Sequence, residues 1–385
     1  MSLLELRNVA GMPFREAEVC SAIGDTVSST GRTGPGPRTL AEALRLELAH
    51  RMDKVLVTGA TGHLGANLTR RLLVDGAAVR VLLRPGGDET GVAGLDVERC
   101  PGDLRDEQAV RRAVRGCGRV YHCAARISTV SGGEREIYET NVTGTRHVLD
   151  SARAAGVERV VVTGSLGAIG RVVGKPSNED VPFNPFEVHT AYTKTKVLVE
   201  QEMLRAVCQG LDAVMAVSCA ILGPHDYFPS RMGRTLLKFA KGGLRAYIDG
   251  GFEFVTTTDI VAGHLLAMDK GRTGHKYLFG SGFRSMDELM ALFADVTGRD
   301  RVPVKLPAAL VSGVGRIASP LLGKLLPGRE QLLTPAAVRL LTSRRRADCS
   351  KSMAELGFVP TSIEGAVRDA HEHFVRRGLL PAVAS

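Results

Sequence analysis

The chain has 385 residues, of which 44% are hydrophobic and 24% charged, and its formal net charge is +9. This composition supports a buried core and excludes global disorder, and the lack of a run of about 18 uncharged apolar residues argues against a membrane-spanning helix. The seven cysteines are scattered without Cys-x-x-Cys spacing, which disfavours a disulfide framework or a zinc module and fits a reducing cytoplasm.

Residues 1–51 are expected to form a flexible N-terminal extension. The segment Asp25–Arg38 is rich in glycine, proline, serine and threonine, and Leu40–His50 is compatible with one short helix. No basic leader precedes a long apolar run, so a secretory signal is not expected and the cytoplasm is the predicted location. The extension is interpreted either as dispensable or as a docking or regulatory segment.

Residues 52–223 alternate between two patterns. Short Val-rich runs predict strands, and the amphipathic stretches between them predict helices. Uninterrupted apolar strands separated by helices indicate a parallel sheet that is covered on both faces, and right-handed crossovers make it doubly wound. The fold class expected here is therefore α/β, a Rossmann-type dinucleotide-binding domain, with part of 246–280 returning to it. The predicted strands are Val55–Val57, Val79–Leu83, Val120–His122, Val160–Val162 and Ala213–Val217, and the predicted helices are Leu64–Val74, Glu107–Val114, Ile137–Ala155 and Tyr192–Val207.

Residues 224–385 are expected to form a smaller, mostly helical part that binds the substrate. The apolar segment Leu306–Leu326 is interpreted as core of this part, with a membrane-surface helix as the alternative, so peripheral membrane contact stays open. The net positive charge can serve nucleic acid, an anionic membrane or a phosphorylated cofactor. Nucleic acid is not expected as a partner, because no binding module accompanies the charge and Arg344–Arg346 is its only dense cluster.

The clearest motif is VLVTGATGHLG, which follows the first predicted strand and opens a helix. Its glycines Gly59, Gly62 and Gly65 permit a tight turn, a close backbone approach to a pyrophosphate, and close packing of helix on strand. The N-terminus of the helix then presents N–H groups to the phosphates. Thr61, His63 and Leu64 lie within the same loop and are expected to contact the cofactor.

The end of the second strand distinguishes the two nicotinamide cofactors. An acidic residue there would bind the ribose 2′-hydroxyl of NAD(H), whereas this strand is followed by Arg84, which can pair with a 2′-phosphate. NADP(H) is therefore favoured, with NAD(H) as the alternative. Asp103 is placed to accept a hydrogen bond from the adenine, with Leu104 beside the ring, and it can also cap the following helix.

Three polar residues are expected at the carboxyl ends of the strands. Ser165 follows a predicted strand, and Tyr192-x-x-x-Lys196 places a phenol and an ammonium one helical turn apart. A cation near a phenol lowers the pKa of the phenol, so Tyr192 can exchange a proton with a substrate oxygen. Ser165 would hydrogen-bond the same oxygen, and Lys196 would hold the nicotinamide ribose.

With these motifs the chain resembles the extended short-chain dehydrogenases/reductases, also called the NAD-dependent epimerase/dehydratase family, and within it the dihydroflavonol reductase-like enzymes. The resemblance implies that Ser165, Tyr192 and Lys196 form the catalytic triad of a hydride transfer at nicotinamide C4, and that a homodimer is common. Ala124, Ala125 and Cys219 are further expected cofactor contacts. The residues that carry the resemblance are Gly59, Gly62, Gly65, Asp103, His122–Ala125, Asn141, Val142, Gly144, Thr145, Ser165, Tyr192, Lys196, Gly223 and Pro224.

The expected function is an NAD(P)H-dependent reduction of a ketone or aldehyde of a small, fairly apolar metabolite, or the reverse oxidation. The alternatives are an NAD-dependent nucleotide-sugar epimerase and a dinucleotide-binding sensor without turnover. Sugar-nucleotide relatives often carry an arginine before the aspartate at position 259, which this chain lacks, and Leu166 and Gly167 stand where dehydratases carry acidic residues. His122 is interpreted as a packed residue, and no metal is expected, since no histidine pair has ligand spacing. The candidate substrate-facing residues are Arg126, Leu166, His189 and Tyr227.

Overall fold

The computed structural model describes residues 54–127, 133–187, 189–300, 302–307 and 335–381. The chain divides into two compact units, Met1–Arg51 and Met52–Ser385, and every described residue belongs to the second. The expected extension 1–51 and most of the apolar segment Leu306–Leu326 lie outside the described residues.

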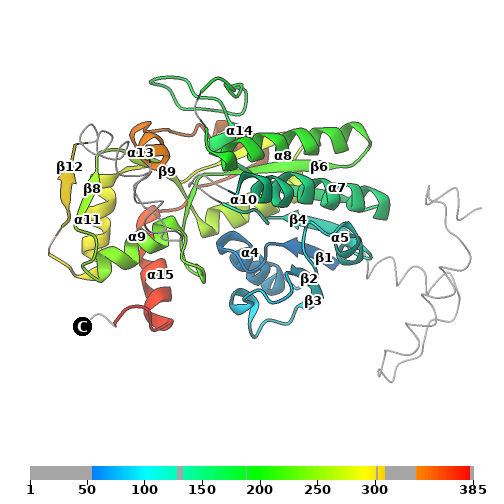
Figure 1. Cartoon of the computed structure of the whole chain (residues 1–385), viewed down its shortest axis with the longest axis horizontal. Helices are drawn as coiled ribbons and strands as arrows, with labels where there is room; N and C mark the ends of the chain where they lie inside the picture. Colours follow the sequence, from blue (N-terminus) through cyan, green and yellow to red (C-terminus); the bar gives the residue numbers. More distant parts are fainter. Residues whose placement is uncertain (1–53, 128–132, 188, 301, 308–334, 382–385) are drawn as a thin grey trace, which may run out of the picture. The chain divides into compact units, whose positions relative to one another are not determined.

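A seven-stranded parallel sheet forms the centre of the second unit (Figure 1). The strand order reverses direction between β1 and β4, as in a doubly wound sheet, so the predicted α/β fold class is confirmed. Its strands, in spatial order, are β10 (Lys276–Phe279), β6 (Ala213–Ser218), β5 (Arg159–Ser165), β4 (Arg119–His122), β1 (Lys54–Thr58), β2 (Ala78–Leu83) and β3 (Glu98–Pro101).

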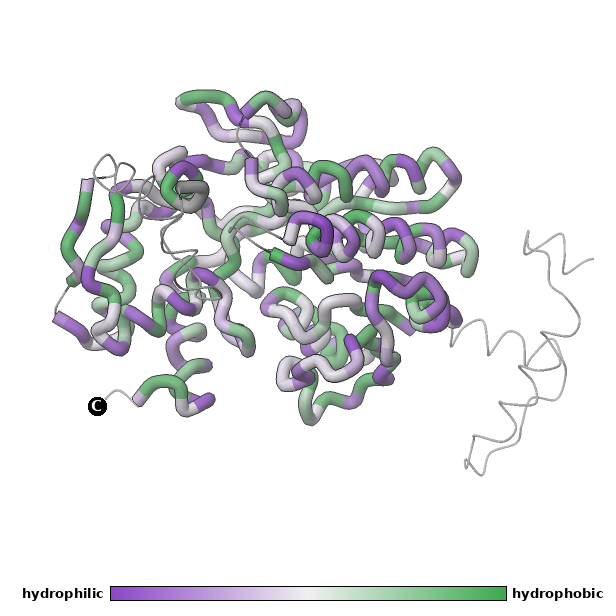
Figure 2. The backbone as a smooth tube through the Cα atoms, in the orientation of Figure 1, coloured by the Kyte–Doolittle hydropathy of each residue, from purple (hydrophilic) through white to green (hydrophobic). Residues whose placement is uncertain are grey.

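Two layers of helices cover this sheet, and successive strand residues alternate between them. Val55 and Val57 of β1 pack with α4 and α10 on one face, whereas Leu56 packs with α5, α7 and α8 on the other. Figure 2 shows the sheet as the most continuous apolar part, with hydrophilic residues along the outer sides of the helices. The helices are α4 (His63–Val74), α5 (Glu107–Val114), α7 (Gly144–Ala155), α8 (Ala191–Cys208) and α10 (Thr257–Lys270).

Short elements connect these layers near the carboxyl ends of the strands. They comprise the 3-10 turns η1 (Thr90–Val92) and η3 (Leu166–Ala168), the helix α6 (Glu134–Tyr138) and the π-helical turn η2 (Glu139–Thr143). A π-helical turn inside a longer helix often marks a functional site, since it redirects one side chain.

The C-terminal part has its own core and more strand than expected. A three-stranded sheet (β11-β9-β7) and a parallel pair (β12-β8) accompany the helices there, because short strands between glycines leave little periodicity to detect. Helix α14 (Ser350–Leu356) packs on β10, so it joins α10 and β10 in returning to the large sheet. The remaining elements are β7 (Ala220–Leu222), α9 (Arg231–Ala240), β8 (Ala246–Ile248), β9 (Gly251–Thr256), β11 (Gly282–Ser285), α11 (Met286–Thr297), β12 (Val304–Leu306), α13 (Pro335–Thr342) and α15 (Ile363–Arg376).

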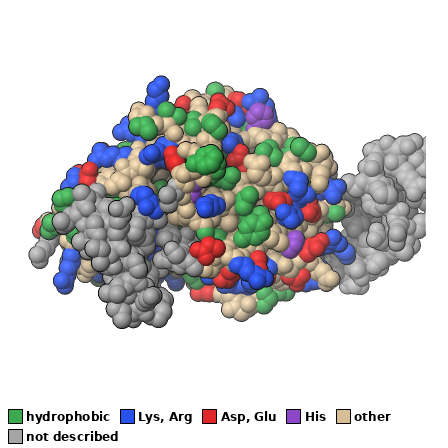
Figure 3. Space-filling model, turned by 45° about the horizontal axis from the view of Figure 1, so that its top comes forward, with side chains coloured by type: hydrophobic (Ala, Val, Ile, Leu, Met, Phe, Trp, Pro, Cys, Tyr) green, Lys and Arg blue, Asp and Glu red, His purple; other side chains and the backbone are tan. Residues whose placement is uncertain are grey.

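The surface mixes both signs of charge. On the face shown in Figure 3, lysine and arginine side chains are interspersed with acidic ones. Ion pairs such as Arg80–Glu98 and Arg272–Glu355 neutralise part of the positive charge locally. None of the helices in the described ranges is long and apolar enough to cross a membrane.

Candidate active site

The proposed catalytic side chains converge where β5 and β6 end. Ser165 is the last residue of β5 and pairs in register with Ser218, the last residue of β6. Helix α8 begins beside them because the Thr190 hydroxyl caps it by accepting from the Thr193 N–H at 3.1 Å. Tyr192 lies in the first turn of α8, and its phenol is near enough to the Ser165 side chain for Ser165 to lower the pKa of the phenol.

The phenol of Tyr192 is protonated at neutral pH in the protein without cofactor. Burial raises its pKa to about 12, and the neighbouring Ser165 side chain opposes this only in part. The expectation that Lys196 lowers the pKa of Tyr192 is therefore wrong for this state. The physical reason is that the Lys196 ammonium is itself buried, which lowers its pKa to about 8, and it donates to the carbonyl oxygen of Thr163 at 2.7 Å.

The buried side chain of His264 contacts Thr163 of β5, the residue whose carbonyl oxygen accepts a hydrogen bond from Lys196. The Thr163 hydroxyl lies 2.8 Å from Nε2 of His264, and Nδ1 of His264 lies 2.7 Å from the carbonyl oxygen of Ile260. A neutral ring that donates from Nδ1 and accepts at Nε2 satisfies both contacts, in keeping with burial lowering the pKa of His264 to about 4. Helix α10 thus fixes β5 just before Ser165, a role that the sequence did not reveal.

Asn141 links a loop at the site to α8. Within the π-helical turn, its side-chain oxygen accepts from the Arg126 N–H at 2.7 Å, and its amide donates to the Arg126 carbonyl and to the Thr195 hydroxyl, each at 3.0 Å. Asn141 lies in this π-helical turn, and its side chain is buried. Asn141 belongs to the motifs that carry the family resemblance, which was the signal available for it.

The glycine loop after β1 has the shape that a dinucleotide requires. Gly59 has φ of +73°, and a Cβ there would lie 2.7 Å from the backbone of Ala124. A Cβ at Gly65 would lie 2.1 Å from the carbonyl oxygen of Gly59, whereas Gly62 is exposed and has open space beyond Gly59. No side chain caps α4 at Gly62, so its first N–H groups remain available to an anion.

The other residues of this loop serve it differently. The Nε2 atom of His63 faces the carbonyl oxygens of Gly223 and Pro224, each at 3.1 Å, so its ring anchors another loop while its backbone stays at the helix start. Leu64 is buried in the core, and Thr61 is partly buried against Gly91.

The strand ends expected to hold the adenosine bring together two arginines and one carboxylate. Arg84 directly follows β2 and is exposed. Arg105 donates to both carboxylate oxygens of Asp103, at 2.9 and 2.8 Å, which holds the pKa of Asp103 below its usual value, and Arg84 adds to this. Asp103 does not cap the following helix, since Asp106 does so, and Leu104 is buried.

Two of the candidate substrate-facing residues belong to segments that contact α8 or follow Ser165 directly. Arg126 is held through its backbone by Asn141, while its guanidinium pairs with Glu136 at 2.8 Å. Leu166, directly after Ser165, is 8% exposed and packs in the core beneath α8.

The other two candidates contact different elements. Nε2 of His189 lies 2.7 Å from the carbonyl oxygen of Asn184 in the loop before α8. Tyr227 accepts from Arg70 of α4 at 2.7 Å, and its ring contacts the guanidinium groups of Arg70 and Arg377, each 5.1 Å from the centroid. The phenol of Tyr227 therefore joins the cofactor-binding helix to the end of α15.

The side chains of Glu253, Cys349 and Cys219 lie close together around Gly280. A Cβ at Gly280 would lie 3.1 Å from the Glu253 carboxylate, 3.3 Å from the Cys349 thiol and 3.5 Å from the Cys219 thiol. Burial raises the pKa of Glu253 to about 7, although the Ala347 N–H donates to its carboxylate at 3.2 Å. Burial also raises the pKa of the Cys219 thiol, so this cysteine is an inert neighbour of the proposed nicotinamide site.

No metal-ligating cluster of three or more His, Cys, Asp or Glu residues occurs among the residues whose positions are described. His122 is buried between the hydroxyls of Thr58 and Thr145, at 2.7 and 2.9 Å, and its pKa is lowered to about 3 by burial. Its interpretation as a packed residue is confirmed.

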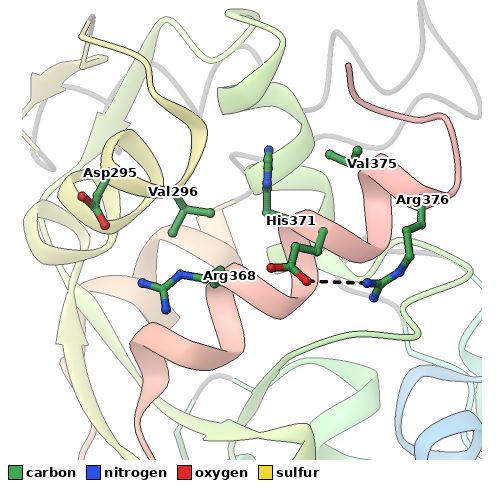
Figure 4. A pocket seen from close by; sticks show the side chains of 7 residues that line it. Asp295, Val296, Arg368, His371, Val375 and Arg376 are labelled. Atoms are coloured by element: carbon green, nitrogen blue, oxygen red, sulfur yellow. Dashed lines mark hydrogen bonds and ion pairs between the residues drawn. The ribbon is translucent and has the colours of Figure 1, made fainter. Parts of the chain in front are cut away.

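A surface hollow of about 540 Å³ lies between α11 and α15, apart from the residues described above (Figure 4). Glu372 and Arg376 form an ion pair at 3.5 Å on its wall. Its lining residues are Asp295, Val296, Arg368, His371, Glu372, Val375 and Arg376. None of them contributes to the group around Ser165, so the hollow is not assigned to the reaction.

Comparison with known proteins places this geometry in context. Residues 55–280 match the family model described as the NAD-dependent epimerase/dehydratase family. The chain is 42% identical over 325 residues to sterol demethylase protein B of Methylococcus capsulatus, covering 84% of this chain and 99% of that protein. It is 33% identical to a Synechocystis protein provisionally named dihydroflavonol 4-reductase (85% and 96% covered). It is 28% identical to human sterol-4-alpha-carboxylate 3-dehydrogenase, decarboxylating (66% and 68% covered).

Replacing Gly65 with alanine tests the loop geometry. The new Cβ would meet backbone atoms of Gly59 at 2.1 Å, and a backbone contact cannot be relieved by a rotamer change. We expect Gly65→Ala to lower the melting temperature and to weaken dinucleotide binding at least tenfold by calorimetry. Gly365→Ala, where nothing lies within 4 Å of the new Cβ, is the control and should leave both unchanged. Equal binding by Gly65→Ala and wild type would contradict this reading of the loop.

Glu253 makes stability depend on pH in a defined direction. Because its pKa is raised from 4.5 to about 7 by folding, the folded state binds this proton more tightly, so the contribution of Glu253 to stability is fully present below pH 4.5 and is lost as pH rises to about 7. We expect Glu253→Gln to gain stability relative to wild type between pH 5 and pH 8 in urea titrations. Asp96→Asn, at an exposed carboxyl, should show no such trend. A constant difference between Glu253→Gln and wild type across this range would show that Glu253 is ionised throughout.

Proposed function

The chain belongs to the NAD-dependent epimerase/dehydratase family, and on that basis we propose that this oxidoreductase interconverts a secondary alcohol and a ketone on an apolar, sterol-like substrate. The observation that carries the proposal is the convergence of three side chains: the Tyr192 phenol interacts with Ser165 at the end of β5, and Lys196, one turn further along α8, donates to the carbonyl oxygen of Thr163 in the same strand. The sterol-like substrate rests on the likeness to sterol demethylase protein B and to the sterol-4-alpha-carboxylate dehydrogenase.

In the direction of reduction, Tyr192 donates a proton to the substrate oxygen. Its high pKa keeps the phenol protonated beforehand, and the Ser165 hydroxyl can hydrogen-bond the oxygen as charge develops on it. When bound, the dinucleotide supplies the hydride. In the reverse direction Tyr192 accepts the proton, which requires nearby positive charge, and Lys196 provides this when it is protonated.

Lys196 and the glycine loop would hold two parts of the dinucleotide, the nicotinamide ribose and the pyrophosphate. The N–H groups at the start of α4 face the pyrophosphate site, and the Lys196 ammonium, which lies at the level of Thr163, would bind the nicotinamide ribose. Ala124 and Ala125 follow β4, with Ala124 against Gly59, and Cys219 follows β6, so we propose these small residues as further contacts of the dinucleotide.

A nucleotide-sugar epimerase fits less well. The position before Asp259 holds Thr258 rather than an arginine, and the Asp259 carboxylate accepts hydrogen bonds from the Ser281 hydroxyl and the Thr361 N–H.

We further propose that the protein is a cytoplasmic homodimer, and size-exclusion chromatography with light scattering would test the oligomeric state.

The Tyr192→Phe variant tests catalysis. Loss of the proton donor should lower kcat by roughly 10²–10⁴-fold with 3-ketosteroids and NADPH or NADH, while the thermal shift on cofactor binding stays. Tyr138→Phe, at a half-exposed tyrosine of α6, is the control and should keep full activity. Full turnover by Tyr192→Phe, or no cofactor oxidation by wild type with any carbonyl compound, would remove the enzymatic proposal and leave a dinucleotide sensor.

The choice of cofactor rests on Arg84, and we propose NADP(H), with NAD(H) as the alternative. Arg84→Asp should weaken NADPH binding by about 10- to 100-fold, the loss expected for charge-assisted bonds to a phosphate. The same variant should change NADH binding less than about threefold or improve it, because a carboxylate suits the 2′-hydroxyl. Arg153→Asp, at an exposed position of α7, is the control. Parallel losses for both cofactors would assign Arg84 no part in their discrimination.

A further inference from the structure

The three consecutive arginines Arg344, Arg345 and Arg346 have three different environments. Arg344 is exposed and pairs with Asp249 at 2.6 Å. Arg346 stacks on the Phe283 ring, with its guanidinium carbon 4.8 Å from the centroid. Arg345, between them in the chain, points inward. Of the three arginines in this cluster, it is the one whose guanidinium is mostly buried.

Arg345 contacts carbonyl oxygens rather than carboxylates among the residues whose positions are described. Its Nη2 atom donates to the carbonyl oxygens of Ile169 and Gly170, and its Nε atom is buried without a hydrogen-bond partner. Within the described part of the chain no carboxylate forms an ion pair with it, although Glu187 lies near enough to favour its charged form. Burial lowers the pKa of Arg345 to about 10. A buried donor without an acceptor and a charge without a counter-charge both lower the stability of the fold. A ligand that supplies the acceptor and the counter-charge would offset this cost.

The guanidinium lies beside the proposed reaction centre. Ile169 and Gly170 end the turn that begins at Ser165. Arg345 also interacts electrostatically with Cys219, the residue after the register partner of Ser165 on β6. A cation from the C-terminal part therefore lies against the end of the turn that follows Ser165.

The segment that carries Arg345 is held rigidly. The Ser177 N–H donates to the Arg346 carbonyl and the Asp348 N–H donates to the Ser177 carbonyl, each at 2.9 Å, which forms a parallel bridge between Ser177 and Ala347. The Ala347 N–H donates to Glu253. This fixed backbone limits the entropy that Arg345 would lose on binding a ligand.

We propose that Arg345 binds a carboxylate of the substrate, close to the carbon that is oxidised or reduced, an inference that rests on the proposed function. A guanidinium presents planar N–H donors that match a carboxylate, and the unpartnered Nε supplies one of them. The phosphates of the dinucleotide have their own proposed site at the start of α4. A second diphosphate, in the substrate, would carry more negative charge than one arginine can neutralise. Arg345 thus selects carboxylated alcohols over neutral ones.

Matched substrates test this selectivity. We would measure NAD(P)-dependent oxidation of a 4α-carboxy-3β-hydroxysteroid and of its 4α-methyl counterpart. Wild type should prefer the carboxylated compound, and Arg345→Met should raise its KM at least tenfold while changing the 4α-methyl compound less than about twofold. Arg345→Lys should restore part of the preference because it keeps the charge. Arg346→Met is the control and should leave both substrates unchanged.

Binding separates this proposal from the proposed function. The thermal shift caused by the carboxylated steroid should vanish in Arg345→Met and persist in Tyr192→Phe, whether or not turnover is seen. Equal losses for both steroids in Arg345→Met, or no preference in wild type, would make Arg345 a structural support for the turn after Ser165. A thermal shift with UDP-glucose that depends on Arg345 would overturn the carboxylate in favour of a diphosphate.

Discussion

The structure depends on the exclusion of a side chain where two backbone segments meet. Gly59 lies against Ala124 at the end of β4, and Gly65 lies against Gly59, so neither position has room for a Cβ. This contact places the start of α4 next to the end of β4, the strand that pairs with β5, and β5 ends at Ser165. The pyrophosphate site and the proposed reaction centre are therefore placed relative to each other by backbone packing, which is rigid, rather than by flexible side chains.

Burial then determines the charge state of the reaction centre more strongly than pairwise attraction does. It raises the pKa of Tyr192 and Glu253 and lowers that of Lys196 and Arg345, so each group is moved toward its neutral form. Such a centre responds to bound ligands, because a charge brought in by cofactor or substrate finds little water to screen it. The proposed roles of Lys196 and Arg345 both use this property, one toward the cofactor and the other toward the substrate.

The sequence predicted those features that are encoded locally. The alternation of apolar runs and the glycine triplet located the sheet and the dinucleotide loop, and the spacing of Tyr192 and Lys196 placed both on one helix. Arg345 and His264 could not be assigned to the site in this way, since each reaches it through contacts between residues about 100 or more positions apart. The pKa of Tyr192 was misjudged because spacing indicates a neighbouring cation but gives no measure of burial.

The stack of Arg70, Tyr227 and Arg377 affects how the molecule can move. Two guanidinium groups that contact one ring join the helix that begins at the glycine loop to the residue that follows α15, and each contact contributes roughly 0.5–1 kcal/mol where solvent reaches it. A hinge between the two parts would have to separate this stack. A large substrate would therefore gain access by local rearrangement of surface loops rather than by rigid-body opening, because the residue after α15 is held to the helix that follows the glycine loop.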